Sequence, residues 1–273
     1  MSKTAAAITT LIILAAAVTG YLLWEDSRMP EPQLQPAPPA AEQPAPAEPP
    51  ATAQEEPEVQ YPVEVEEEEE APPLPALDES DATFRTALSE LFGGATFTDL
   101  FRPQDIVRRI VVTIDNLPRE VVAERLRPIQ PVPGRFQIQD NNGAFAIAPD
   151  NAQRYARYVG VLERIDAKQF KALYTRFYPL FQSAYRDLGY PNGYFNDRLV
   201  AVIDHLLAAP DLEQPVALVQ PHVFYRYADP ELESASAGHK LMWRIGSKNA
   251  ARVKAKLREI RAVVTAKSDD KDN

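Results

Sequence analysis

The chain of 273 residues contains no cysteine, only ten glycines and only three histidines. Without cysteine it has no disulfide, thiolate metal ligand, thiol nucleophile or lipid-bearing lipoprotein residue. The glycines form neither of the common phosphate-binding loops, nor the Gly-x-Ser-x-Gly elbow of serine hydrolases. His205, His222 and His239 stand neither three nor four residues apart, and no paired-histidine zinc motif occurs. The sequence therefore predicts no metal site and no cofactor.

Positive charge is scarce at the start of the chain. Residues 1–80 hold 2 Lys and Arg against 16 Asp and Glu, whereas residues 81–273 hold 27 against 23. The formal charge of −10 therefore belongs to the first 80 residues, and the remainder is mildly basic.

Charge is also absent from Thr4 to Trp24, a run of 21 residues that is long enough to cross a bilayer as a helix. Lys3 precedes this run and Glu25 follows it, which predicts that the amino terminus stays inside and the rest is exported. We therefore expect residues 1–28 to form an uncleaved membrane anchor, with residues 4–24 in the membrane. The alternative is a cleaved signal peptide, because the small residues 15–17 offer a cleavage site.

Residues 29–80 are predicted to be a disordered linker rich in proline and glutamate. Residues 29–77 contain 14 of the 26 prolines and no glycine, and residues 66–70 are five consecutive glutamates. Proline fixes φ, like charges repel and little apolar surface remains to be buried, so such a tract is extended. It is interpreted as a spacer that holds a domain away from the membrane. The alternative is a low-complexity tract with no task of its own.

Residues 81–267 are predicted to form a single, mostly α-helical domain with one small β-hairpin, and residues 268–273 a disordered tail. Eleven of the 24 aromatic residues fall between Tyr155 and Phe195, where apolar side chains recur at helical spacing. Helices are predicted to begin near residues 81, 103, 118, 151, 167, 196, 230, 236 and 247, with a kink or restart at Pro179 in the fifth.

The hairpin is predicted from alternating apolar residues between Phe136 and Ile147, around a loop of three or four residues at Asp140–Gly143. Two later stretches, residues 216–219 and 223–227, also have extended character. Their continuity is too poor to predict strands.

A dense polar cluster after residue 219 is the first candidate binding site. Tyrosine and arginine together suit a binding surface, because they combine flat apolar area with directional donors. The alternative is a surface loop whose Arg226 pairs with a nearby acid and whose tyrosines are half-buried. The candidate residues are Gln220, His222, Tyr225, Arg226, Tyr227 and Glu233, with Asp229 and Glu231 between them.

The last helix supplies a second candidate surface. Val253, Leu257, Ile260 and Val264 form one apolar stripe that should pack on the domain. Lys254, Arg258 and Arg261 should then largely project outward as a positive face for an anionic partner, or simply be solvated. Nucleic acid is not expected as a partner, because the anchor places the domain on the other side of the membrane.

An enzymatic alternative depends on Glu233. Glu233-Ser234 followed by Gly238, Leu241 and Met242 is faintly similar to the Glu-Ser and Gly-Leu-Met pattern of lytic transglycosylases, whose glutamate acts as a general acid. The interval between the two halves is short for that family. Asp197 and Asp204, seven residues apart, are a second carboxylate pair, of a kind that is common on solvated helix faces.

Four phrases together carry a wider resemblance: VVTIDNL (111–117), LYTRFYPLFQSAYRDLGYPNG (173–193), PVALVQPHVFYRYADPELES (215–234) and RIGSKNAARVKAKLREIR (244–261). They resemble the bacterial domain-of-unknown-function family numbered three-thousand-and-fourteen, over nearly all of residues 81–265. The family is typically found behind an amino-terminal anchor in Gram-negative bacteria, and the resemblance implies an envelope protein with one domain. It implies no activity and no catalytic residues.

From these observations we expect a single-pass inner-membrane protein of a Gram-negative bacterium, with its carboxyl-terminal domain in the periplasm. The leading function is a non-enzymatic binding domain for an envelope partner, which is a protein, a glycan or an anionic lipid. The alternative is a cell-wall glycan-cleaving enzyme. A cleft that holds a buried glutamate would favour the enzyme, and a shallow Tyr/Arg surface or an apolar patch would favour the binding domain.

Overall fold

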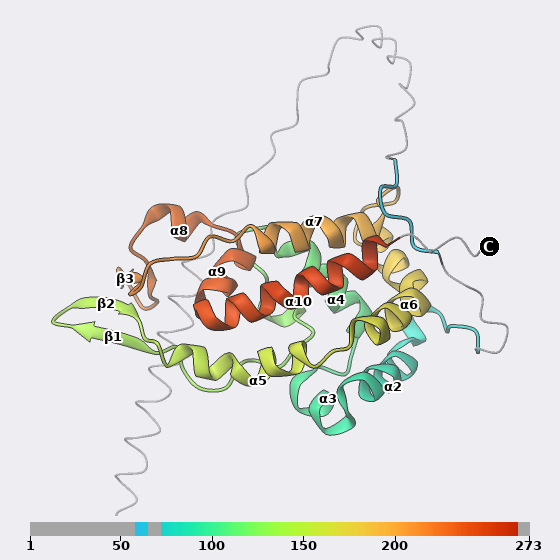
Figure 1. Cartoon of the computed structure of the whole chain (residues 1–273), viewed down its shortest axis with the longest axis horizontal. Helices are drawn as coiled ribbons and strands as arrows, with labels where there is room; N and C mark the ends of the chain where they lie inside the picture. Colours follow the sequence, from blue (N-terminus) through green and yellow to red (C-terminus); the bar gives the residue numbers. More distant parts are fainter. Residues whose placement is uncertain (1–57, 65–71, 267–273) are drawn as a thin grey trace, which may run out of the picture. The chain divides into compact units, whose positions relative to one another are not determined.

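The structure is a computed structural model that describes residues 58–64 and 72–266 (Figure 1). The predicted anchor, most of the predicted linker and the predicted tail lie outside these residues. Among the residues described, none of the helices combines the length and apolarity that crossing a bilayer requires. The described residues all belong to one structural unit, Glu55–Asn273.

Helices make up most of this unit, and the mostly α-helical prediction is confirmed (Figure 1). The helices are α2 (Asp81–Phe92), α3 (Gly94–Leu100), α4 (Ile106–Asn116), α5 (Asn151–Glu163), α6 (Ala167–Asp187), α7 (Phe195–Leu207), α8 (Pro230–Ser234), α9 (Ala237–Arg244) and α10 (Ser247–Thr265). Two short 3-10 turns are η1 (Leu77–Glu79) and η2 (Glu124–Leu126), and the strands are β1 (Ile138–Asn141), β2 (Ala144–Ile147), β3 (Ala217–Val219) and β4 (Arg226–Tyr227).

Local capping explains where several helices begin. The Asp166 carboxylate accepts hydrogen bonds from the backbone N–H groups of Lys168 and Gln169, both at 2.9 Å, and so starts α6. The Ser236 hydroxyl accepts from the His239 N–H at 3.1 Å and starts α9. Both starts were predicted from the sequence, because aspartate and serine satisfy donors that the first turn leaves free.

Three helices differ from the sequence prediction. Gly93, with φ of 82°, ends α2 as expected, but α3 begins at the very next residue. Helix α6 is continuous through Pro179, so it does not restart there, although a proline inside a helix costs about 3 kcal/mol. The predicted helix after Pro118 is absent, and only the short turn η2 forms in that stretch.

The sheet is larger than the single predicted hairpin, which is a correction. Four antiparallel strands lie in the order β1-β2-β3-β4, and Leu218 pairs with Phe145 on one side and Tyr227 on the other. The β1–β2 turn uses only Asn142 and Gly143, whose φ angles of 56° and 87° fit a type I′ turn. Strands β3 and β4 were missed because three and two residues are too short to show alternation, and because β3 joins the sheet by pairing with β2, more than seventy positions away.

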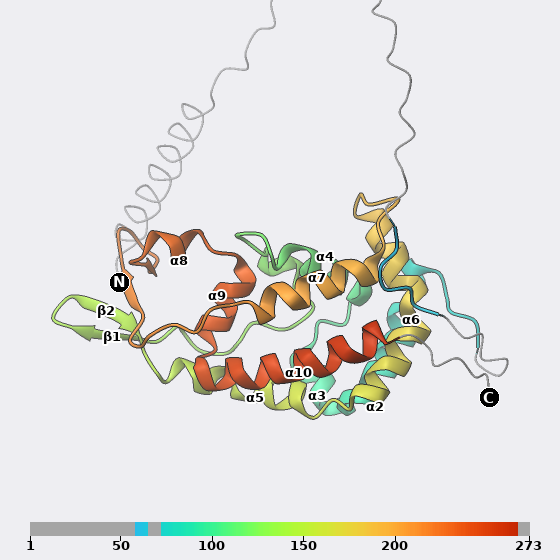
Figure 2. The same cartoon turned by 45° about the horizontal axis from the view of Figure 1, so that its top comes forward.

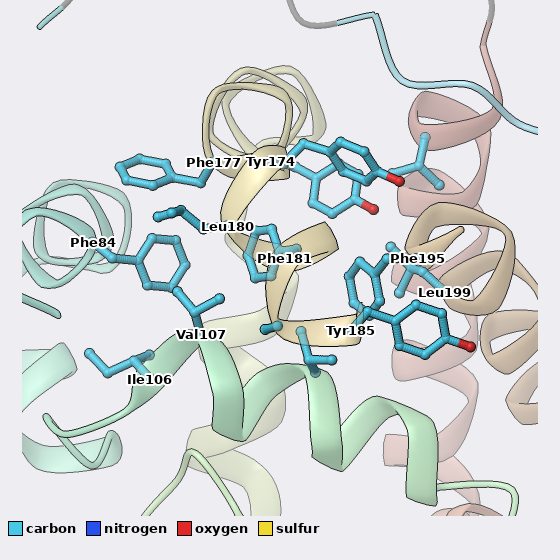
Figure 3. Packing of buried hydrophobic residues seen from close by; sticks show 14 of the residues in the cluster. Phe84, Ile106, Val107, Tyr174, Phe177, Leu180, Phe181, Tyr185, Phe195 and Leu199 are labelled. Carbon is cyan, nitrogen blue, oxygen red and sulfur yellow. The ribbon is translucent and has the colours of Figure 1, made fainter. Parts of the chain in front are cut away.

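The largest core cluster lies where α2, α4, α6 and α7 meet (Figure 3). Phe177 of α6 meets Phe84 of α2 edge-on, with ring centroids 4.9 Å apart. Phe181 of the same helix stacks on Phe195 of α7 at 5.7 Å. Helix α10 packs along α5 and α7 (Figures 1 and 2). The predicted apolar stripe of α10 contacts these cores, and Ile260 and Val264 are buried.

Part of the segment predicted as a linker lies on the helical unit. Tyr61 and Val63, and then Leu74 and Leu77, are partly buried against the largest core cluster. These four side chains interrupt the Pro/Glu-rich composition. In the sequence these four residues are isolated apolar positions in a polar tract. No local pattern predicts that they pack against a part of the chain that is distant in sequence.

Candidate functional site

The predicted polar cluster forms the β3–β4 hairpin and the start of α8. Tyr227 is buried and meets Trp243 of α9 edge-on, with ring centroids 5.7 Å apart. Burial raises the pKa of the Tyr227 phenol above its usual value. Tyr225 is half-buried and packs edge-on against Phe145 of β2, at 5.4 Å. These two tyrosines therefore hold the hairpin on the domain.

Glu233 also has a structural role. Its carboxylate accepts a hydrogen bond from the Tyr227 backbone N–H, at 2.9 Å, and so joins α8 to β4. The remaining candidates, Gln220, His222 and Arg226, are exposed to solvent. The structure thus divides the predicted site into residues that build the hairpin and residues that lie on its surface.

The exposed large apolar residues of this hairpin were not among the predicted site residues. Val223 and Phe224, here called the hairpin tip, lie between β3 and β4 with 77% and 79% of their surface exposed. Val219 at the end of β3 is exposed too, at 43%. In the sequence these two residues are a Val-Phe pair in a short extended stretch. Such a pair is equally consistent with a buried strand, so it did not predict an exposed tip. Exposed large apolar residues grouped in this way are typical of contact surfaces.

Two of the three predicted cations on the positive face of α10 are paired with neighbouring groups. Lys254 donates to the carbonyl of Ala209 at 2.6 Å and lies 3.3 Å from the Asp211 carboxylate. Arg261 makes two hydrogen bonds to Asp204 of α7, at 2.6 and 2.9 Å. Of the three predicted cations only Arg258 is exposed.

Lys256, which was not predicted as a site residue, is buried on the same helix. Its ammonium donates to the Ile165 carbonyl at 2.9 Å and pairs with Glu259. Residue spacing within α10 could not predict these partners, because each lies more than forty positions away in the sequence. They are the carboxylates of Asp204 and Asp211 and the carbonyls of Ile165 and Ala209.

One serine and two histidines lie together between α7 and α9. His205 Nε2 is 2.8 Å from Ser236 Oγ, and the His205 and His239 rings stack with centroids 4.2 Å apart. Burial, followed by the charges of His239 and Arg198, lowers the pKa of the His205 imidazole. A serine beside a histidine can form a nucleophile and base. Here the Ser236 hydroxyl already accepts the His239 N–H as the cap of α9, and this structural role accounts for its position.

A cavity of about 20 Å³ lies beside Trp243 and Lys254, and a groove of about 780 Å³ lies between α2, α3 and Gln130. Neither is lined by Glu233, Ser236 or His205. Within residues 58–64 and 72–266, no three His, Asp or Glu side chains gather in a way that could hold a metal ion.

The two predicted carboxylates of α7 have separate roles. Asp204 pairs with Arg261, whereas Asp197 accepts two backbone N–H groups from residues 60 and 61. They therefore do not form a paired acid–base site.

Comparison with known proteins places the chain in a family without an assigned activity. Searches of curated proteins and of solved structures found no match. The family model described as "Protein of unknown function (DUF3014)" matches residues 106–261, from the first residue of α4 to the last turns of α10. This match covers more than half of the chain and includes the β3–β4 hairpin. The chain therefore belongs to the family of proteins of unknown function DUF3014.

Proposed function

We propose that this protein is a non-enzymatic binding domain, tethered to the inner membrane of a Gram-negative bacterium through residues 4–24 and exposed to the periplasm. The observation that carries the binding role is the hairpin tip, where Val223 and Phe224 are largely exposed. Exposed aromatic and apolar residues are expensive to leave in water and are enriched in the centres of interfaces. The charge pattern around residues 4–24 supports the anchor and its orientation.

Among the three envelope partners, a protein with an apolar pocket fits the hairpin tip best. A protein pocket can enclose the Phe224 ring, and Arg226 and His222 at the rim can supply polar contacts. An anionic lipid fits less well, because Lys254 and Arg261 are already paired with carboxylates. A glycan partner would more often use aromatic rings laid open in a cleft, whereas Tyr225 and Tyr227 are packed against the domain.

The position of Glu233 does not support the alternative that the protein cleaves glycans. A general acid needs a carboxyl group that reaches the substrate in a cleft. The Glu233 carboxylate instead accepts the Tyr227 N–H, and it lines neither of the two cavities described above.

A pull-down from intact envelopes tests the proposed binding role. The full-length protein is compared with Val223→Ser and Phe224→Ser, and we expect each change to reduce recovery of the same partner at least fivefold. Val121→Ser is the matched control, because Val121 is 72% exposed but lies outside the hairpin. Equal recovery with all variants would exclude the hairpin tip as the contact surface. Recovery of anionic lipid or wall polymer in place of a protein would overturn the choice of partner.

Protease accessibility tests the proposed topology. Protease added to spheroplasts should digest the chain after residue 28 while cytoplasmic marker proteins stay intact. Complete protection of the chain together with those markers would place the domain on the other side of the membrane.

A further inference from the structure

Residues 58–64, here called the docked segment, lie on the helical unit without helix or strand, and the chain bends at Gln60 and Tyr61. Tyr61 and Val63 are partly buried against the largest core cluster, whereas Gln60, Pro62 and Glu64 are exposed. This alternation is what an extended chain produces when one side faces a surface. The segment passes the ends of α6, α7 and α10 (Figures 1 and 2).

Three residues near the start of α7 hold the backbone of this segment. The Asp197 carboxylate accepts the N–H groups of Gln60 and Tyr61, at 3.0 and 2.8 Å. The Tyr194 hydroxyl accepts the Val63 N–H at 2.6 Å. The Asn196 amide donates to the Tyr61 carbonyl at 2.8 Å. Tyr194, Asn196 and Asp197 are called the tether-binding site below.

Proline at position 62 fits this pattern. The N–H groups of Gln60, Tyr61 and Val63 donate to the site, and the residue between the last two, Pro62, contributes no bond. Proline has no N–H to satisfy, and its fixed φ keeps the segment extended before it binds. An ordered ligand loses less entropy on binding, so Pro62 favours docking.

The site is held rigidly by the core. Asn196 has 0% of its surface exposed. Its Oδ1 accepts from the Tyr174 hydroxyl at 3.0 Å, and its Nδ2 also donates to the Val264 carbonyl at 2.9 Å. The amide is therefore oriented by α6 and α10 before the segment arrives. Without the segment, one donor of this buried amide would lose its protein partner, which is costly.

Tyr194, Asn196 and Asp197 bind the backbone of the segment, so selectivity must come from its side chains. Tyr61 enters the core beside Arg261, whose pKa is raised mainly by Asp204 and to a lesser degree by Tyr61. Val63 enters the same cluster. Backbone bonds combined with pockets for alternate side chains are how many domains recognise extended peptides.

We propose that the tether-binding site is a peptide-recognition site for an extended aromatic-proline-valine sequence, and that residues 58–64 occupy it as an intramolecular ligand. This proposal does not depend on the hairpin tip.

Docking shortens the chain between the predicted anchor and α2, and release would add residues 58–71 to that reach. Fully extended, these residues span up to roughly 45 Å. Occupancy of the site therefore sets how far the domain can travel from the membrane.

Hydrogen exchange on the full-length protein tests the docking. The amides of Gln60, Tyr61 and Val63 should exchange at least tenfold more slowly than those of an unstructured chain. Asp197→Asn should speed exchange of Gln60 and Tyr61 at least tenfold while the amides of α6 stay protected. The matched control is Asp99→Asn, which alters an exposed carboxylate that pairs with Arg157 on the surface. Wild-type amides that exchange at the free-chain rate would overturn the proposal.

Peptide competition tests recognition. Tyr61→Ser with Val63→Ser, in the full-length chain, should empty the site. A labelled synthetic peptide of residues 57–65 should bind this variant at least tenfold more tightly than the wild type, where the attached segment competes at an effective millimolar concentration. Adding Asp197→Asn should weaken that binding at least tenfold, and a peptide of scrambled order should not bind.

Two results would contradict the peptide-recognition proposal. A variant that keeps its core amides protected but does not bind the peptide at millimolar concentration would show that the site is not selective. Protected segment amides in a chain that light scattering shows to be a dimer would assign the segment to a second copy. If the emptied variant does not fold, Asp197→Asn alone decides between docking and no docking by the exchange measurement above.

Discussion

Phe177 shows how a single side chain holds several helices together. It is 2% exposed, lies on α6, and meets Phe84 of α2 edge-on (Figure 3). Phe177→Ala would leave a cavity among aromatic neighbours that cannot collapse into it, so we expect the free energy of unfolding to fall by about 3–5 kcal/mol.

Urea denaturation of the full-length protein measures this loss. Phe224→Ala is the matched control, because its ring is 79% exposed and its removal should cost less than about 0.5 kcal/mol. A loss at Phe177 as small as that at Phe224 would mean that the cluster around α6 is not the core.

His205 predicts a dependence of stability on pH. Burial is the main cause of its lowered pKa, with the charges of His239 and Arg198 next, so folding disfavours the protonated imidazole. An unfolded histidine takes up its proton near pH 6.5. The contribution of His205 is therefore fully present above that pH and is lost as the pH falls below it, towards the folded-state pKa.

The urea concentration at the unfolding midpoint should decrease when the pH is lowered from about 7.5 to about 5.5. His205→Gln should make this decrease smaller. His222→Gln, at an exposed histidine outside the stacked pair, should leave the difference unchanged. A midpoint that rises on acidification, or an equal difference in His205→Gln, would contradict the prediction.

At the scale of elements, Asp115 connects α4 to α7. Its side chain is 3% exposed and accepts from Arg198 Nε and Arg119 Nη2, both at 2.9 Å. The Tyr190 hydroxyl, from the turn between α6 and α7, lies 3.3 Å from the same carboxylate. A buried carboxylate with three donors joins these elements more firmly than surface ion pairs do.

Asp115→Ala should lower the free energy of unfolding by about 2–3 kcal/mol, since three donors lose a charged acceptor. Asp99→Ala is the control, because its pair with Arg157 is exposed on both sides and should contribute at most about 1 kcal/mol. Equal losses in urea denaturation would show that the Asp115 cluster is no stronger than a surface pair.

At the scale of the whole molecule, the fold begins before α2. Tyr61, Val63, Leu74 and Leu77 contact the largest core, so a fragment of residues 55–273 should be more stable than one of residues 81–273. Partial burial of four side chains suggests a difference on the order of 3 kcal/mol. Both fragments should unfold cooperatively, because α2 to α10 supply most of the core.

Denaturation of the two fragments, and of a third that starts at residue 72, would separate the docked segment from η1. Identical midpoints for all three would show that the residues before α2 add nothing to the fold. They would also contradict a stabilising role for the hydrogen bond from the Asn196 amide to the Tyr61 carbonyl.

By itself, the sequence determined the helical class and most helix positions. Asp166 and Ser236 mark helix starts, and the apolar stripe of α10 predicts the side that packs, because caps and periodicity depend on residues only a few positions apart. It also identified the polar stretch that contains the β3–β4 hairpin, although not its exposed Val-Phe tip.

Tertiary structure alone decided the contacts between distant residues. Helix α6 continues through Pro179, where the sequence allowed a restart, and β3 gains strand character by pairing with β2 and β4. Arg261 pairs with Asp204, fifty-seven positions away in the sequence, and the Tyr61 N–H donates to Asp197, one hundred and thirty-six positions away. Such contacts depend on where the fold places two residues in space, and no property of either local sequence encodes that distance.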